Sequence, residues 1–198
     1  MKHWLMSLLA TVLLAVPMAP AQAAAVTDES EVTVMGSGLQ MTQTKPQFTD
    51  VTLDMKNTQT SQATNDLYVM DARGTAAGWG ITLRATDFKL TRTINGAPVD
   101  FIIPASAVSF SANYKGALVG TNIDFTSGKG ELAKSKVLSS RDERIVGVVP
   151  SEGAGTHRIG VNYTLAVPKL IQGSNGKTVG LLQGTYTSTF TYTATAGL

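Results

Sequence analysis

A two-residue alternation of apolar and polar side chains constrains this chain more than any other feature. It is clearest over residues 157–167, where the apolar side chains share one face: Ile159, Val161, Tyr163, Leu165 and Val167. Similar short segments recur along the chain, and glycine-containing turns separate them at 95–98, 115–116, 127–130, 153–155 and 173–176. This spacing is typical of half-buried strands joined by short connections. The sequence therefore predicts an all-β fold, a single antiparallel β-sandwich that is immunoglobulin-like or a related barrel.

Strands are expected wherever apolar residues alternate or run together between turn signals. The expected strands are 48–55, 68–71, 79–86, 101–104, 107–114, 118–125, 144–149, 158–167 and 181–196, with a weaker candidate at 31–35. The polar run 56–65 has the composition of a long exposed loop, and 131–138 has room for one or two helical turns. In the last expected strand Tyr186, Phe190 and Tyr192 share a face, which we expect to be the buried one, opposite a face of threonines.

Residues 68–88 contain two apolar runs separated by a glycine- and alanine-rich turn. The second run places Trp79, Ile81, Leu83 and Ala85 on one face. Gly74 and Gly78 mark the reversal between the two runs. We therefore expect an antiparallel pair of strands joined by a loop longer than a tight hairpin.

Two patches of this sequence resemble the signatures of the WxL domain of Gram-positive surface proteins. The first is Val69-Met70-Asp71-Ala72-Arg73-Gly74-Thr75 followed by Gly78-Trp79-Gly80-Ile81, and the second is the threonine- and tyrosine-rich run 184–193. Ile81 stands where the family has Leu, and Tyr192 stands where it usually has Trp. The two patches bracket roughly residues 66–195, which is most of the chain.

The resemblance implies a secreted module that binds the bacterial cell wall without a covalent bond. The ligand would be peptidoglycan or an associated wall polymer, and companion cell-surface proteins would be partners. The residues carried over as ligand-binding candidates are Asp71, Arg73, Trp79, Tyr186 and Tyr192. For Trp79 two interpretations stay open: the alternation favours packing in the core, whereas an exposed indole would be a stacking platform.

The first 23 residues have the pattern of a secretory signal peptide. Lys2 gives a positive start, an apolar core runs from 5 to 16, and Ala21-Gln22-Ala23 is a small-residue cleavage site. The apolar core is shorter than the roughly 20 residues that span a bilayer, although an uncleaved anchor stays possible. After cleavage we expect one domain, with N-terminal strands and a polar loop at 24–65 and the WxL-like β domain at 66–198. The sequence ends without a sorting motif, so we expect no covalent attachment and no membrane insertion.

The side chains needed for chemistry are sparse. The chain has no Cys, which excludes thiol catalysis, and without Lys2 it has 15 Lys and Arg, one fewer than the full chain's 16, against 14 Asp and Glu. Such a balance offers no basic surface for nucleic acid. The remaining histidine, His157, is expected at the surface rather than in a catalytic pair. We therefore expect no enzyme activity and no cofactor. The alternatives are a surface-fibre subunit that assembles through strand edges and, more weakly, a wall hydrolase.

The signal peptide yields the first testable prediction. The secreted protein should begin at or near Ala24, because the apolar core and the Ala-Gln-Ala site precede it. Intact-mass measurement or N-terminal sequencing of the secreted form checks this. A cell-bound form that keeps residues 1–23 would contradict it.

Overall fold

The computed structural model describes residues 36–54, 57 and 59–197. The expected signal peptide and the strand candidate at 31–35 lie outside these residues. Those that are described belong to one unit, Met35–Leu198, and form thirteen strands and a single 3-10 turn, η1 (Ala105–Ala107). The described residues contain no α-helix, and therefore no helix long and apolar enough to cross a membrane. The all-β prediction is confirmed.

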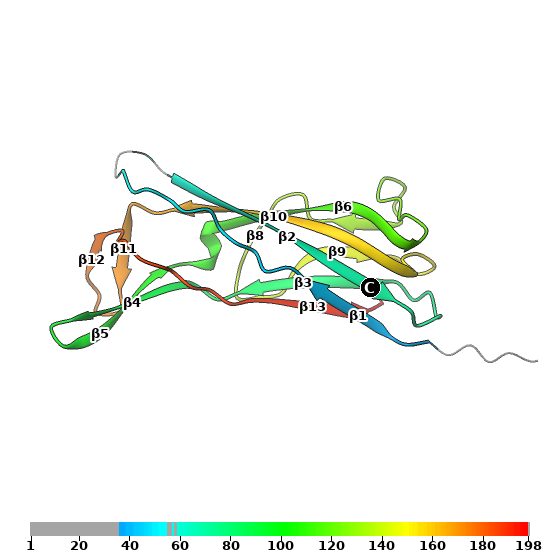
Figure 1. The fold of residues 1–198 in the computed structure, drawn as a ribbon, viewed down its shortest axis with the longest axis horizontal. Helices are drawn as coiled ribbons and strands as arrows, with labels where there is room; N and C mark the ends of the chain where they lie inside the picture. The colour runs from blue at the N-terminus through cyan, green and yellow to red at the C-terminus, as the bar shows by residue number, and fades with distance from the viewer. Residues whose placement is uncertain (1–35, 55–56, 58, 198) are drawn as a thin grey trace, which may run out of the picture. The chain divides into compact units, whose positions relative to one another are not determined.

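The strands form three antiparallel sheets (Figure 1). Sheet A has the order β1 (Leu39–Gln43), β2 (Gln59–Asp71), β10 (Gly155–Val167), β6 (Val108–Gly120) and β8 (Lys136–Val137). Sheet B has the order β13 (Phe190–Ala196), β3 (Trp79–Ala85), β9 (Glu143–Val148) and β7 (Gly130–Leu132). Sheet C has the order β12 (Thr178–Gly180), β11 (Leu170–Gly173), β5 (Ala97–Ile103) and β4 (Phe88–Ile94).

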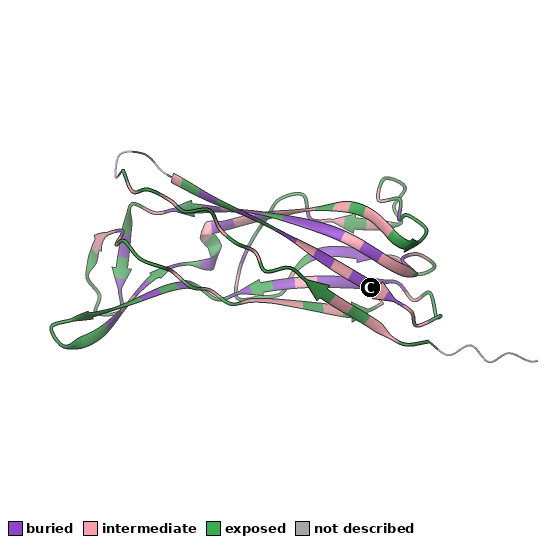
Figure 2. Ribbon diagram, in the orientation of Figure 1, coloured by how far each residue is buried: buried purple, intermediate pink, exposed green. Residues whose placement is uncertain are grey.

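Sheets A and B pack face to face, as the predicted sandwich requires. Leu67, Val69, Ile159 and Val161 of sheet A are buried, as are their counterparts in sheet B, Trp79, Ile81, Leu83, Val146 and Val148. Figure 2 shows the resulting alternation of buried and less buried residues along β2 and β10. The apolar face predicted for 157–167 is confirmed in full, because all five of its side chains are buried.

The polar run expected to be an exposed loop at 56–65 is instead mostly strand. From Gln59 onward it belongs to β2 and pairs with β10, with Gln59 opposite Val167. The inward positions Ser61, Ala63 and Asn65 are buried. They are small or polar, so the alternation carried no hydrophobic signal there. The prediction was wrong because hydrogen bonds from distant segments satisfy Ser61 and Asn65 inside the fold.

Four other local predictions need correction. Residues 48–54 are irregular rather than a strand, and 181–189 are mostly irregular, with β13 beginning at Phe190. The segment 131–138 holds parts of two short strands, β7 and β8, instead of helical turns. Residues 107–125 were expected as two strands, but β6 continues through Gly116 to Gly120. Gly116 has a φ of 116°, and the register with β10 shifts beside it. Gly116 therefore lies in a β-bulge within β6 and not in a turn between two strands.

The two runs expected to pair across 72–78 lie in different sheets. β2 belongs to sheet A and β3 to sheet B, so the connection crosses the sandwich instead of closing a hairpin. Both strands are buried on their apolar faces, and crossing allows these faces to meet. Gly78 makes the close approach possible: its φ is 71°, and a Cβ there would lie 2.3 Å from the Val148 carbonyl oxygen.

Two glycines of the crossing, Gly74 and Gly78, have the same φ but different surroundings, so their substitutions can be compared directly. Gly74→Ala should cost about 1–2 kcal/mol of unfolding free energy, because Gly74 has a φ of 71° but open space around it. Gly78→Ala, at the same φ, should cost roughly 1–3 kcal/mol more because its methyl group meets the Val148 carbonyl. Urea unfolding of both variants measures the difference. Equal costs would show that sheet B does not approach Gly78 this closely.

Candidate functional site

Trp79, the leading ligand-binding candidate, lies in the core between the two sheets. It is fully buried, and its Nε1 donates a hydrogen bond of 2.9 Å to the Gly153 carbonyl. Its ring centroid lies 5.9 Å from that of His157 on β10. Gly153 has no side chain to obstruct this bond, since a Cβ there would lie 2.5 Å from Nε1. The core interpretation of Trp79 is therefore the one that the structure supports.

Asp71 and Arg73 form a two-pronged ion pair at the crossing. Arg73 Nε donates to Asp71 Oδ1 at 2.8 Å, and Arg73 Nη2 donates to Oδ2 at 2.8 Å. The same Nη2 donates to the Gly78 carbonyl at 2.6 Å, which ties both ends of the connection together. These hydrogen bonds hold the pKa of Asp71 below its ordinary value despite its burial. Both side chains are thus engaged in holding the crossing.

His157, expected at the surface, is fully buried beside Trp79. The Ala154 carbonyl accepts from Nε2 at 3.2 Å, so the neutral ring accepts at Nδ1 from the Tyr114 hydroxyl at 2.9 Å. Burial lowers the pKa of His157, which keeps the ring neutral. The prediction was wrong because position 157 continues the buried alternation of β10. Its role is structural.

Tyr192 points toward sheet A and joins a hydroxyl network. Its hydroxyl lies 2.7 Å from that of Tyr163 and accepts a hydrogen bond from Asn65 Nδ2 at 3.1 Å. Burial raises the pKa of both tyrosines. The network satisfies three polar groups between the sheets, and Tyr192 keeps a partly exposed edge.

A groove of about 1320 Å³ lies beside this network, between the walls formed by residues 43–53 and 181–190. Tyr186 and Tyr192 both line it, so the structure brings these two candidates to one surface. Its floor is apolar and includes Phe88, Ile103, Leu165 and Val167. Phe48 reaches inward from the first wall, with its ring centroid 5.6 Å from that of Phe88.

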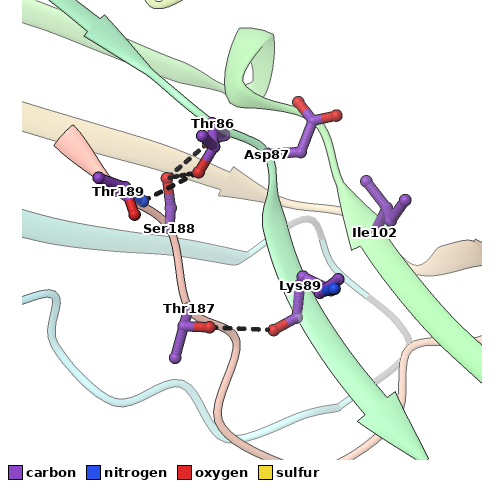
Figure 3. Close-up of a pocket in the computed structure, with 7 residues that line it drawn as sticks. All are labelled: Thr86, Asp87, Lys89, Ile102, Thr187, Ser188 and Thr189. Carbon is purple, nitrogen blue, oxygen red and sulfur yellow. Dashed lines mark hydrogen bonds between the residues drawn. The ribbon is translucent and has the colours of Figure 1, made fainter. Parts of the chain in front are cut away.

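The second wall is hydrogen-bonded to the turn between β3 and β4 and to the start of β4. Lys89 and Thr187 exchange backbone hydrogen bonds of 2.9 and 3.0 Å, and Thr86 N donates to the Thr189 carbonyl at 3.0 Å. Hydroxyl contacts of Thr86 with Ser188 add to this, around a hollow of about 360 Å³ (Figure 3). The wall is therefore held from its outer side.

The outer face of sheet A is a second candidate surface, and the sequence analysis predicted no binding residue on it. Three rows of residues cross β2, β10 and β6 in register: Gln62–Thr164–Ser109, Thr64–Asn162–Ser111 and Asp66–Gly160–Asn113. Every residue in these rows except Gly160 is exposed or half-exposed. The alternation that buries Val161 and Tyr163 already places Asn162 and Thr164 on this side, so a signal was present.

The charged side chains at the edge of this outer face form one cluster around Asp66. Asp66 accepts from Lys115 Nζ at 2.7 Å and also pairs with Arg158 Nη2, and these bonds lower its pKa. Lys115 reaches Asp66 by passing over Gly160, where a Cβ would lie 2.5 Å from Lys115 Cε. The face therefore combines hydroxyl and amide groups with a charge cluster in which one carboxylate pairs with two cations.

Other acidic side chains with lowered pKa values also have structural partners. Asp100 accepts from Thr91 Oγ1 at 2.6 Å and from Lys89 Nζ at 3.2 Å, while Asp124 accepts from the Thr126 hydroxyl and amide. Within the described ranges, no group of three or more His, Asp or Glu side chains is arranged to hold a metal ion. These carboxylates stabilise turns and strands.

No protein-family model matches the sequence, and no curated protein matches it. Among solved structures, the chain is similar to the collagen binding domain of Erysipelothrix rhusiopathiae surface protein RspB, with 11% identity and a TM-score of 0.20. The match covers 83% of this chain and 61% of that chain, so this chain spans less than two thirds of its length. A TM-score of this size establishes neither a shared fold nor a shared function.

The ion pair at the crossing predicts a large cost of substitution. Arg73→Ala should lower the unfolding free energy at pH 7 by about 3–5 kcal/mol, because Asp71 is left buried without its partner. Arg73→Lys keeps the charge but not the two parallel bonds, so it should lose less. Chemical unfolding of the three proteins measures this. A cost below about 1 kcal/mol for Arg73→Ala would show that the pair does not hold the crossing.

The same pair predicts a dependence on acid. The folded pKa of Asp71 lies below its ordinary 3.8, so the contribution is fully present above about pH 4. It is lost as the pH falls through the lowered folded pKa. The stability difference between the wild-type protein and Asp71→Asn should therefore shrink on acidification below pH 4. A difference that stays constant with pH would contradict this.

Proposed function

We propose that this protein is a secreted, non-catalytic module that binds the bacterial cell wall without a covalent bond. The wall polymer, peptidoglycan or an associated polymer, lies on the outer face of sheet A. The observation that carries the proposal is the set of three in-register polar rows across β2, β10 and β6. They form a broad surface on which Thr64, Asn162 and Ser111 face away from the core, toward a long chain molecule.

The chemistry of these rows suits a polymer rich in hydroxyl and amide groups. Thr and Ser hydroxyls both donate and accept, and the amides of Asn162 and Gln62 do the same. Wall glycans carry hydroxyl and acetamido groups that need such partners. Because Asp66 pairs with Lys115 and Arg158, this cluster keeps only one net positive charge, and attraction between opposite charges is a minor contribution. Binding should therefore depend only weakly on salt.

Two sequence features support the location and the target. The signal peptide expected at 1–23 directs the chain out of the cell. The resemblance of the Asp71–Trp79 stretch to the WxL signature favours the wall as the ligand and companion surface proteins as partners. In the structure β3, which begins at Trp79, pairs with β13, which contains the end of the second patch, and Leu83 lies opposite Tyr192. The two regions that carry the resemblance therefore lie next to each other in sheet B.

The placement of the titratable groups supports a binding role over catalysis. His157 is buried against Tyr114 and Trp79, and Asp66, Asp71, Asp100 and Asp124 are bonded to structural partners. A general base needs an orienting partner and access to substrate. His157 has the partner but lacks the access.

A second candidate function, a subunit of a surface fibre, is favoured by the groove between the two walls. Such a groove is large enough to receive a segment of another chain, and Tyr186 and Tyr192 line it. The two functions use different surfaces, so one protein can perform both.

Co-sedimentation with purified cell wall tests the proposed function. The secreted protein should sediment with the wall, and the double variant Thr64→Ala/Asn162→Ala should bind about tenfold more weakly, because two hydrogen-bonding side chains of the central row are lost. Thr193→Ala, at an exposed position on β13, is the control and should bind normally.

Walls stripped of secondary polymers identify the ligand. Retained binding indicates peptidoglycan, and lost binding indicates the associated polymer. Absence of sedimentation with both walls, or equal binding by the double variant and the control, would contradict the proposal.

A further inference from the structure

The groove between residues 43–53 and 181–190 exposes part of the hydrophobic core. Its floor is made of core side chains from sheets A and C, including Leu165 and Phe88, and its volume of about 1320 Å³ exceeds the usual 300–1,000 Å³ of small-molecule pockets. An apolar floor of this size matches an extended segment that brings several side chains. The occupant suited to it is therefore a peptide strand.

Each wall of the groove is joined by backbone hydrogen bonds to a neighbouring segment. Thr44 N donates to the Asp66 carbonyl and Thr49 N to the Gln62 carbonyl, so the first wall is bonded to β2 on its outer side. The second wall is bonded to Thr86 and Lys89 on its own outer side. Among the described residues no backbone hydrogen bond joins one wall to the other. A strand lying between them would find backbone groups on both sides.

The chain itself offers a segment of the right kind. Residues 24–35 lie outside the described part, and Glu31–Met35 alternates, with Val32 and Val34 on one face. At about 3.3 Å per residue, these twelve residues reach about 40 Å when extended.

The point at which this segment joins the fold favours the groove of a second copy over the groove of its own molecule. Ser37 N donates to the Ala72 carbonyl, so the segment leaves beside the Asp71 end of β2. The groove runs along β2 toward its other end, where Gln59 Nε2 donates to the Thr52 carbonyl in the first wall. To enter the groove of its own molecule the segment would have to reverse at Gly36. The groove of a neighbouring copy requires no reversal.

We propose that residues 24–35 of one copy enter the groove of the next as an added strand, with Val32 and Val34 on the apolar floor. The two interacting surfaces differ, so the contact is head-to-tail and links successive copies into a series, which is open unless the rotation between copies closes a ring. Such an assembly needs neither a cofactor nor a covalent step. It is independent of wall binding on the outer face of sheet A.

Sedimentation velocity of the secreted protein over a range of concentrations tests this. The wild-type protein should form a ladder of oligomers. Val32→Asp/Val34→Asp should raise the concentration of half-assembly at least tenfold, because two charges would lie on the apolar floor. Thr27→Asp/Thr33→Asp adds the same charge to the opposite face and should assemble at nearly the wild-type concentration.

A groove variant completes the test. Thr185→Arg places a charge on an exposed lining residue and should also prevent self-assembly, while blue-shifted Trp79 emission confirms that it is folded. An equal mixture of Thr185→Arg and Val32→Asp/Val34→Asp should form dimers and no longer species, since only one productive contact exists. A monomeric wild-type protein, unchanged assembly of the valine variant, or no dimer in the mixture would overturn the proposal.

Discussion

The structure depends on the crossing between β2 and β3, which carries the chain from one sheet of the sandwich to the other. The Asp71–Arg73 ion pair and its bond to the Gly78 carbonyl fix this connection, and Trp79 enters the core directly after it. Burying an indole of about 150–250 Å² contributes roughly 4–6 kcal/mol before entropy is counted. The crossing also places the apolar faces of both strands opposite each other, so the rest of the core forms around it.

Polar groups inside the sandwich are paired across long distances in sequence. Asn65 meets Tyr192, which is 127 residues away, and His157 meets Tyr114, which is 43 residues away. A buried polar group without a partner costs about 1–3 kcal/mol, so each of these pairs favours one registry of the sheets over others. His157, Asp71 and Tyr192 have side chains of the kinds that catalyse reactions or bind ligands. In this fold all three are hydrogen-bonded inside the protein instead.

The two surfaces left for recognition follow from the layout of the sheets. The outer face of sheet A stays polar because alternation sends Thr64, Asn162 and Ser111 away from the core. The groove exists because residues 43–53 and 181–190 run beside the sheets with few strand pairings. One surface offers hydroxyl and amide groups, whereas the other offers an apolar floor, so they fit different partners.

The sequence by itself determined the fold class and the inward face of the regular strands, because a two-residue period is a local property that each strand carries alone. It therefore correctly placed the alternate apolar residues of β10, Ile159 to Val167, in the core, and it favoured the core for Trp79 without deciding it. Only the tertiary structure decided which sheet β2 and β3 join, that residues 59–65 form a strand, and that His157 is buried. Those outcomes rest on partners far away in the chain, such as Thr49 for Ser61 and Val167 for Gln59, and no local pattern encodes such partners.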